Sequence, residues 1–248
     1  MRLRDMGAEA VLLGGGGRAI LLQLAHPSVG HAVAEHSTFG TDPTRRLRHT
    51  LAYVYALFWG TPAQAQFVTA MVEKAHAPVH STAYDANDPV LQLWVNATLY
   101  DSAVMVHERV FGPLSTADAD AIYDDYAEIG VALRMPRALW PADRAAFQRY
   151  WDASVTLLAV DEVTRGVART LHHPPVAPLW LRASMPLARF LTAGLLPPGL
   201  RAAYGLKWNE KRQHRFDRMM LATALVYPHL PRALRHWPKN HLLGKIPG

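Results

Sequence analysis

Two groups of basic side chains in the sequence are of the types that bind anions, metal ions or a cofactor iron. The first is a cluster of three arginines and a histidine: Arg45, Arg46, Arg48 and His49. The second is a pair of histidines four residues apart, His76 and His80. Guanidinium groups bind carboxylates and phosphates through paired hydrogen bonds, and neutral imidazole is a common metal ligand.

The arginine cluster stands at the expected start of a helix. Asp42 is a suitable N-cap, and Pro43 suits the first helical position because its missing N–H would have no partner there. Cations near a helix N-terminus are disfavoured by about 0.3 to 1 kcal/mol each, and such a breach of local preference tends to mark a functional position. The cluster therefore predicts a site for a phosphate or carboxylate. The alternative is that these arginines pair with carboxylates elsewhere or point into water.

The same segment predicts a stripe along one helix face, by residues three and four positions apart. Its members are Arg46, His49, Thr50, Tyr53 and Leu57. The stripe runs from a cationic end through polar groups to an apolar end. It suits the wall of a pocket that holds cofactor carboxylates at one end and a hydrophobic substrate at the other. The alternative is a core stripe with a charged terminus.

His76 and His80 would share one face of a continuous helix, and two such histidines can bind zinc. A metalloprotease motif also needs a glutamate between them, but the residues there are alanine, proline and valine. Pro78 breaks the helix near this point, so the two imidazoles need not stay on one face. A haem iron needs only one of these histidines as its axial ligand, so a haem site requires fewer protein ligands than a zinc site.

Three further histidines, His26, His31 and His36, are spaced five residues apart. Along a helix each is turned by about 140° from the last, so they cannot converge on one metal ion. We interpret them as capping histidines or as buried histidines with hydrogen-bond partners.

Composition restricts the kinds of site that the chain can contain. Half of the 248 residues are hydrophobic and 19% are charged, which is typical of a globular protein with a full core. The sequence has no cysteine, which excludes disulfides, cysteine-ligated zinc, iron–sulfur clusters and thiol catalysis. A metal would therefore depend on the 13 histidines, on carboxylates, or on a cofactor that brings its own ligands.

The net charge of +6 favours anionic partners, but the arginines are spread along the chain without a nucleic-acid-binding motif, so we do not expect a nucleic-acid partner. The N-terminus lacks the pattern of a signal peptide, and no apolar run is long enough to span a membrane. We expect a cytoplasmic protein. The apolar and basic stretch from Pro178 to Leu206, broken by prolines, could lie on a membrane surface. We favour the alternative that it packs as one or two short core helices.

The elements that must position these residues are helices. A capping residue or a proline recurs ahead of segments with apolar residues every three or four positions, as at Thr61-Pro62, Asp88-Pro89, Ser115 and Trp140-Pro141. Sustained alternation of apolar and polar residues is absent from the sequence, so strands are not expected. The pattern predicts an all-α chain of about eight to eleven helices. Because neither an internal repeat nor a low-complexity linker is present, residues 1–248 are expected to form a single domain.

Three segments together resemble a known enzyme family. They are GGGGRAILLQLAHPSVGHAVAEHSTFGTDPTRRLRHTLAYV from Gly14, LQLWVNATLYDSAVMVHERVFGPLSTADAD from Leu91, and AGLLPPGLRAAYGLKW from Ala193. In this order they are similar to the family of the rubber oxygenase (latex-clearing protein) and the fungal mycophenolic-acid-pathway oxygenase, over roughly residues 14–238. The resemblance implies an all-α, globin-like core that holds haem b, and it implies oxidative cleavage of isoprenoid double bonds as the best-known chemistry of the family.

The resemblance also implies roles for individual residues. The family element Arg-x-x-Lys-Thr falls on Arg46, His49 and Thr50, which we expect to be catalytic, with Arg46 also meeting the haem. His76 opens the element His-x-x-Val and is the expected proximal ligand of the haem iron. Tyr53 and His80 are further candidates for contact with the cofactor.

The sequence departs from the family at two of these positions. His49 stands where the rubber oxygenase has a lysine that can cap the iron, so an imidazole is a candidate distal ligand. Asn96 stands where many relatives have histidine, which removes an alternative ligand and favours His76. Glu35 is the nearest candidate for the glutamate base of the rubber oxygenase.

These features lead to the expectation of a haem b-dependent oxygenase that uses O2 on a small hydrophobic substrate, such as an isoprenoid or other lipid-like alkene. Two other functions stay open. One is a haem carrier or sensor without turnover, in which His49 and His76 both ligate the iron. The other is a helical lipid-binding or membrane-surface protein that uses the segment from Pro178 to Leu206.

Overall fold

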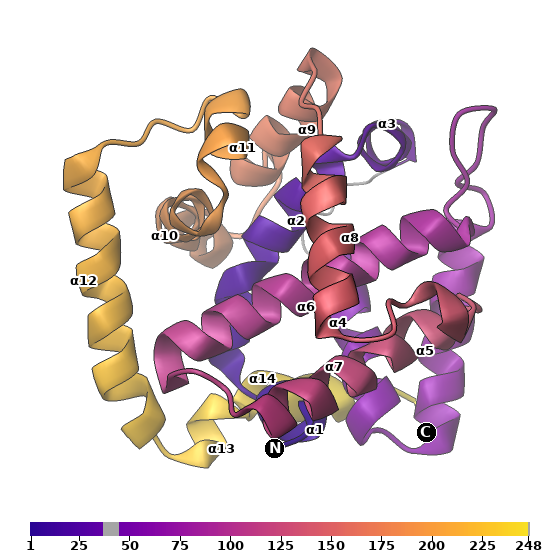
Figure 1. The fold of residues 1–248 in the computed structure, drawn as a ribbon, viewed down its shortest axis with the longest axis horizontal. Coiled ribbons are helices and arrows are strands. Elements are labelled where there is room, and N and C mark those ends of the chain that lie inside the picture. Colours follow the sequence, from indigo (N-terminus) through magenta and orange to yellow (C-terminus); the bar gives the residue numbers. More distant parts are fainter. Residues whose placement is uncertain (37–44, 248) are drawn as a thin grey trace.

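The structure is a computed structural model that describes residues 1–36 and 45–247, apart from the side chain of Arg46. The described residues form fourteen α-helices and three short 3₁₀ helices, with one isolated bridge between His80 and Asp85 as their only β pairing (Figure 1). The expected all-α class is therefore confirmed.

The α-helices are α1 (Leu3–Met6), α2 (Gly16–Ala25), α3 (Pro27–His36), α4 (Arg45–Trp59), α5 (Pro62–His76), α6 (Pro89–Phe111), α7 (Thr116–Val131), α8 (Arg144–Thr156), α9 (Glu162–His172), α10 (Leu179–Leu195), α11 (Pro198–Ala203), α12 (Glu210–Val226), α13 (Arg232–Arg235) and α14 (Trp237–Leu243). The 3₁₀ helices are η1 (Ala10–Gly15), η2 (Arg137–Leu139) and η3 (Tyr227–His229).

The number of helices exceeds the expected eight to eleven because of four short ones. Ten of the fourteen have ten or more residues, and α1, α11, α13 and α14 have between four and seven. A helix of seven residues makes fewer than two turns, so it leaves too little of the three-and-four pattern for detection.

The capping pattern of the sequence is confirmed at three helix starts. Thr61, Asp88 and Ser115 each accept a hydrogen bond from a backbone N–H in the first turn of α5, α6 and α7. The expected start at Trp140-Pro141 is displaced, because α8 begins at Arg144. Its N-cap is Asp143, whose carboxylate accepts from the backbone N–H of Ala146.

The long helix α6 runs through the middle of the fold and carries a large share of the core (Figure 1). It contacts α2, α7, α12 and η1. Trp94 of α6 is almost fully buried and stacks on Trp151 of α8, with ring centroids 5.5 Å apart. Tyr100 packs edge-on against Tyr123 and Tyr126 of α7. Aromatic side chains of this size bury large apolar areas, so α6 holds α7 and α8 in place.

Two glycines allow α10 to approach its neighbours closely. A Cβ atom on Gly17 of α2 would lie 2.0 Å from the Oγ1 atom of Thr192, and one on Gly194 would lie 2.2 Å from the ring of Phe216 on α12. Any larger residue at either position would push the helices apart. The run of four glycines in the sequence thus serves, at Gly17, the packing of α2 against α10.

The stretch from Pro178 to Leu206 divides into an exposed and a buried part. Leu179 and Trp180 at the start of α10 are 80% and 67% exposed, whereas Thr192 and Leu195 near its end are buried. The preferred expectation of short core helices is therefore wrong for the first half of α10, whose side chains are mostly exposed, whereas the second half packs closely on Gly17 of α2 and Phe216 of α12. None of the helices in the described ranges has the length and apolar character needed to cross a bilayer.

Candidate functional site

The helices α4 and α5 form an antiparallel hairpin that brings the predicted site residues to one end. The two helices contact each other, and only Gly60 and Thr61 separate them in the sequence. His49 lies in the second turn of α4, and His76 is the last residue of α5. Because the hairpin is antiparallel, both histidines lie toward its open end, away from the connection. The two histidines that the family resemblance makes candidate ligands of the iron therefore lie at the same end of the hairpin.

His49, Thr50 and His76 are all half-buried, so each side chain can contact protein atoms on one side and a bound molecule on the other. The backbone of Arg46 belongs to α4, but its side chain lies outside the described atoms. The predicted capping residues Asp42 and Pro43 also fall outside the described residues. The proposed contact of Arg46 with a cofactor carboxylate therefore stays a prediction.

The stripe along α4 is most buried at Tyr53, and its apolar end at Leu57 is half-buried. Tyr53 is only 4% exposed, and Leu57 packs against the main core cluster. The Tyr53 hydroxyl donates a hydrogen bond of 2.6 Å to the backbone carbonyl of Ile129 on α7, and burial raises the pKa of this hydroxyl. The tyrosine is therefore neutral and already serves helix packing. Its predicted role toward a cofactor stays untested.

The structure separates His76 from His80. Helix α5 ends at His76, and the backbone N–H of Val79 turns back to the carbonyl of His76 at 2.8 Å. His80 is exposed and pairs through its backbone with Asp85. The interpretation that Pro78 breaks the helix near this point is thus confirmed, and the two histidines do not belong to one continuous helix.

The loop of residues 77–88, at the upper right of Figure 1, connects α5 to α6, and its Tyr84 contacts the end of α3. The hydroxyl of Tyr84 donates to a carboxylate oxygen of Glu35, and the Nε2 atom of His36 lies 2.9 Å from the same hydroxyl. The hydrogen bond to Glu35 raises the pKa of Tyr84. Tyr84 of the loop that follows His76 therefore forms a hydrogen-bond network with Glu35 and His36 of α3. This network holds the candidate base Glu35 beside the loop.

Tyr84 is a residue that reasoning from the sequence missed. It lies in the irregular segment STAYDAND, where no helical period gives its neighbours. A buried tyrosine needs a partner for its hydroxyl, but the partner's identity depends on how the loop folds back on α3.

Asn96 is buried on α6, and its side-chain amide donates to the carbonyl of Tyr126 at 3.0 Å. Its Oδ1 atom has no hydrogen-bond partner among the described residues, and the same is true of Oε1 of Gln92 one turn earlier. The amide of Gln92 donates to the carbonyl of Ala86 at 3.4 Å, which braces the loop that follows His76. Buried polar atoms without partners are uncommon and are often the places where a bound group or a water completes a structure.

The three histidines spaced by five residues do not converge, as the helical rotation predicts. His26 ends α2 beside Trp94, with ring centroids 6.4 Å apart, and burial lowers its pKa. His31 pairs with Asp161 at 2.6 Å. His36 contacts Tyr84, as described above. His31 and His36 therefore have hydrogen-bond partners as expected, but neither is buried, so the expectation of burial is wrong for both.

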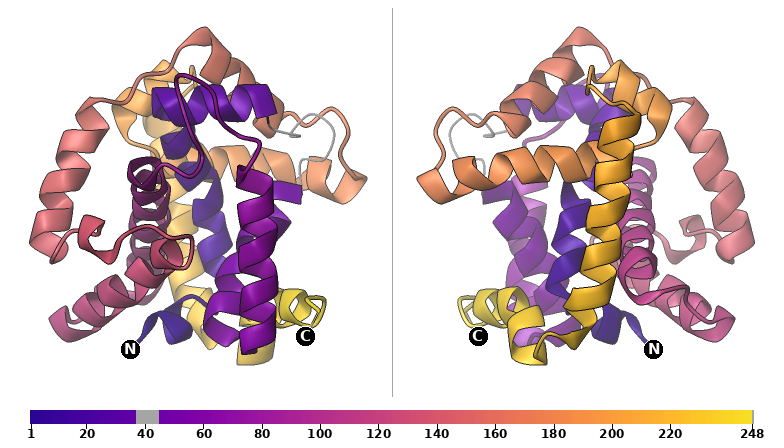
Figure 2. Two further views of the ribbon diagram at one scale, coloured as in Figure 1. Left: turned by 90° about the vertical axis from the view of Figure 1, so that its right-hand side faces the viewer. Right: turned by 90° about the vertical axis from the view of Figure 1, so that its left-hand side faces the viewer.

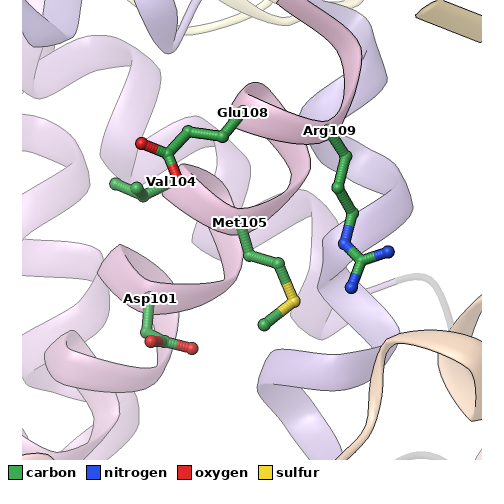
Figure 3. Close-up of a pocket in the computed structure, with 5 residues that line it drawn as sticks. All are labelled: Asp101, Val104, Met105, Glu108 and Arg109. Atoms are coloured by element: carbon green, nitrogen blue, oxygen red, sulfur yellow. The ribbon is translucent and has the colours of Figure 1, made fainter. Parts of the chain in front are cut away.

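A pocket of about 420 Å³ lies elsewhere, along the last turns of α6. It is lined by Asp101, Val104, Met105, Glu108 and Arg109 (Figure 3). Asp101 is already paired with the buried Arg18 of α2, whose Nη2 atom lies 2.6 Å from Oδ2 of Asp101. None of the histidines or arginines that the sequence selected lines this pocket, and its charges are mixed.

The donor set at the open end of the hairpin is of the types that can hold a haem. In the described part of the chain, no group of three or more histidine, aspartate or glutamate side chains is arranged to hold a metal ion. A haem needs less from the protein, because the porphyrin supplies the in-plane ligands and the protein adds one or two axial ones. The imidazoles of His76 and His49 are of the right type for the axial positions. Arginine is of the right type for haem propionates.

Comparisons with known proteins show the family to which the sequence is similar. Residues 3–225 match the family described as ER-bound oxygenase mpaB/B′/rubber oxygenase, catalytic domain. The chain is 36% identical over 228 residues to the uncharacterized protein Mb2261 of Mycobacterium bovis and equally to the uncharacterized protein Rv2237 of Mycobacterium tuberculosis, with 88% of this chain and 89% of each relative covered. No solved structure matches.

Proposed function

This chain belongs to the mpaB/rubber oxygenase catalytic-domain family, and on that premise we propose that it is a haem b-dependent oxygenase with a small hydrophobic alkene as its substrate. The family supports an oxygenase in general, so O2 is the expected co-substrate. The haem and the class of alkene, isoprenoid or otherwise lipid-like, are the parts that we add.

The observation that carries the proposal is the shared location of His49 and His76. They come from the two packed helices of the α4–α5 hairpin, and both lie toward its open end. When bound, haem would supply the iron that binds and activates O2. His76 would hold that iron from the proximal side.

The other residues of α4 would surround the distal side. His49 and Thr50 follow the arginine cluster on the same helix face and can hold a proton or donate a hydrogen bond to a bound oxygen atom. Arg46 would neutralise a haem propionate through a charge-assisted hydrogen bond. The buried ring of Tyr53 and the apolar side chain of Leu57, further along the stripe, would exclude water from this side of the hairpin.

Glu35 is our candidate for the base. The hydroxyl of Tyr84 holds its carboxylate at the end of α3, and the loop that carries Tyr84 begins directly after His76. A carboxylate fixed in this way can accept a proton from a substrate that enters between α3 and the hairpin.

The test is the absorption spectrum of the purified protein, with haem supplied during expression, for the wild type, His76→Ala and His80→Ala. The wild type should show the Soret band of bound haem. His76→Ala should lose it, because the proximal ligand is gone. His80→Ala is the matched control, since His80 is exposed and outside helix α5, and it should keep its haem.

A His76→Ala protein with full haem content and an unchanged spectrum would contradict the assignment of the ligand. A wild type that binds no haem after supplementation would contradict the proposed cofactor. A ferrous spectrum that is six-coordinate, low-spin and unreactive with CO would instead identify a carrier or sensor, in which His49 and His76 both bind the iron.

A further inference from the structure

A second pocket, of about 310 Å³, lies between the end of α9 and the first half of α10. It is lined by His172, His173, Pro174, Pro175, Arg182, Met185 and Arg189. The lining includes two arginines and no carboxylate. None of these residues belongs to the site proposed for the haem.

The guanidinium group of Arg189 is fixed at this pocket by its neighbours. Its Nη1 atom donates to the backbone carbonyl of His172 at 3.1 Å and lies 2.9 Å from Nδ1 of His173. Arg182 is exposed, and neither arginine forms an ion pair with a carboxylate in the described ranges. The pocket therefore has an excess of positive charge, and guanidinium groups are well suited to a phosphate.

His172 adds a neutral polar group to the wall. It is 6% exposed, and its Nε2 atom has no hydrogen-bond partner among the residues that the structure describes. Burial, followed by the charges of Arg189 and His173, lowers the pKa of His172 to about 4, so the ring is uncharged at neutral pH. A buried nitrogen without a partner at a cationic pocket is a group that a bound oxygen atom or a bridging water would satisfy.

The rim of the pocket is apolar and projects from the protein. Val176, Leu179, Trp180 and Leu187 are 64%, 80%, 67% and 54% exposed. Figure 2 shows that the first half of α10 protrudes beyond the neighbouring helices. Tryptophan and leucine at the tip of a helix, next to arginines, are typical of segments that lie in the interface of a membrane.

We propose that this surface binds an anionic phospholipid in a membrane: Arg182 and Arg189 contact the headgroup phosphate, and Leu179 and Trp180 enter the boundary with the acyl chains. The charge of the pocket selects the anionic headgroup, and the apolar rim selects a lipid over a free phosphate. The contact is peripheral and lies along the first half of α10. It requires neither haem nor the oxygenase reaction.

The experiment is co-sedimentation of the full chain with phosphatidylcholine vesicles, with and without phosphatidylglycerol. The wild type should bind the vesicles that contain phosphatidylglycerol and should bind pure phosphatidylcholine weakly. Arg182→Gln should lower the partition coefficient about fivefold, because one cation near an anionic surface is lost. Leu179→Ser should lower it roughly tenfold, because an apolar side chain is lost from the interface.

Each variant has a matched control, one on α8 and one directly after its end. Arg149→Gln removes the same charge from an exposed position, and Leu157→Ser removes a leucine that is 75% exposed. Both controls should bind as the wild type does, and circular dichroism should show that all four variants are folded. Equal losses in the variants and their controls would overturn the proposal, since binding would then reflect general charge or hydrophobicity.

Two other results would also overturn it. One is equal binding to both kinds of vesicle, which would mean that the arginines do not select an anionic headgroup. The other is saturable binding of inorganic phosphate in calorimetry without any binding to vesicles, which would identify a site for a free anion.

Discussion

The hydroxyl of Tyr53 on α4 donates to the backbone carbonyl of Ile129 on α7 at 2.6 Å, and this bond joins the helix that carries the predicted distal residues to the core. Ile129 lies in the last turn of α7, where carbonyl groups have no donor within the helix. Asn96 of α6 donates to the carbonyl of Tyr126 one turn earlier. Through these two bonds α7 orients both α4 and α6.

Tyr53→Phe should lower the free energy of unfolding by about 1 to 2 kcal/mol, because a buried carbonyl loses its donor. Urea denaturation measures this change. Tyr55→Phe is the matched control: Tyr55 is a buried tyrosine on the same helix whose hydroxyl has no hydrogen bond in the described residues, and the cost should be smaller. Equal costs for the two variants would mean that the bond to Ile129 contributes nothing. Unchanged haem content in Tyr53→Phe would indicate a packing role and argue against contact between this hydroxyl and the cofactor.

Arg18→Met should destabilise the protein by about 3 kcal/mol, because it leaves Asp101 without its counter-charge in a largely buried position. Arg18 is 2% exposed and also donates to the carbonyl of Leu195 at 3.0 Å and to Oγ of Ser102 at 2.7 Å, so it joins α2, α6 and α10. Burial lowers the pKa of Arg18 and raises that of Asp101, and their attraction opposes both shifts.

Thermal and urea denaturation of two further variants test this account. Adding Asp101→Asn to Arg18→Met should restore part of the lost stability, since the uncompensated charge is removed. Arg2→Met is the control for an exposed pair: Arg2 pairs with Asp125, its side chain is 63% exposed, and its loss should cost less than about 1 kcal/mol. A double variant that is less stable than Arg18→Met would refute the role given to the charge.

The lowered pKa of His172 predicts that the folded protein loses stability in mild acid. Its folded pKa of about 4 lies below the ordinary value of 6.5, so between these values the unfolded chain binds a proton that the folded protein does not. Stability should therefore fall as the pH decreases from about 6.5 to about 4, by at most about 3 kcal/mol for this group. The charged neighbours that oppose protonation are Arg189 and His173.

The measurement is the free energy of unfolding at neutral and mildly acidic pH for the wild type, His172→Gln and His214→Gln. His172→Gln should show a weaker dependence on pH than the wild type, because the titrating group is gone. His214 is exposed on α12, and its replacement should leave the dependence unchanged. The same slope in all three proteins would exclude His172 as the cause.

The sequence predicted the helices well where they are long and capped. Thr61, Asp88 and Ser115 mark true helix starts because their side chains accept bonds from backbone N–H groups that lie only two or three residues away. The failures are of two kinds. Very short helices such as α13 leave no periodic pattern, and the first half of α10 has the apolar composition of a core helix although it is exposed. Composition does not say which apolar face finds a neighbour.

The family resemblance predicted more of the candidate site residues than the local spacing of residues did. The spacing of His76 and His80 suggested a pair, and only the turn at Pro78 separates them. That His49 and His76 lie toward the same end follows from the antiparallel hairpin, which the short connection at Gly60 makes necessary. The contact of Tyr84 with Glu35 and His36 depends on a loop that folds back over many residues, and no local pattern in the sequence encodes it.

The substitution of histidine for lysine at position 49 predicts a change of the haem spectrum with pH. If the imidazole of His49 binds the iron, its protonation removes the lone pair that the iron needs, and this should occur between about pH 5 and 8. The resting protein should therefore change from six-coordinate to five-coordinate or water-bound haem as the pH falls through this range. Absorption and resonance Raman spectra report the coordination state directly.

Two variants identify the group that titrates. His49→Lys should move the transition to higher pH or abolish it. An ordinary lysine ammonium loses its proton at about pH 10.4, well above the neutral range. His49→Ala should leave a distal position that is open or filled by water and that still binds CO. His36→Ala is the control, since His36 is bonded to Tyr84 at the end of α3, and its spectrum should titrate as the wild type does. A wild-type spectrum that is constant over this range and identical in His49→Ala would mean that His49 does not bind the iron, and that its half-buried position beside Thr50 is a matter of helix packing.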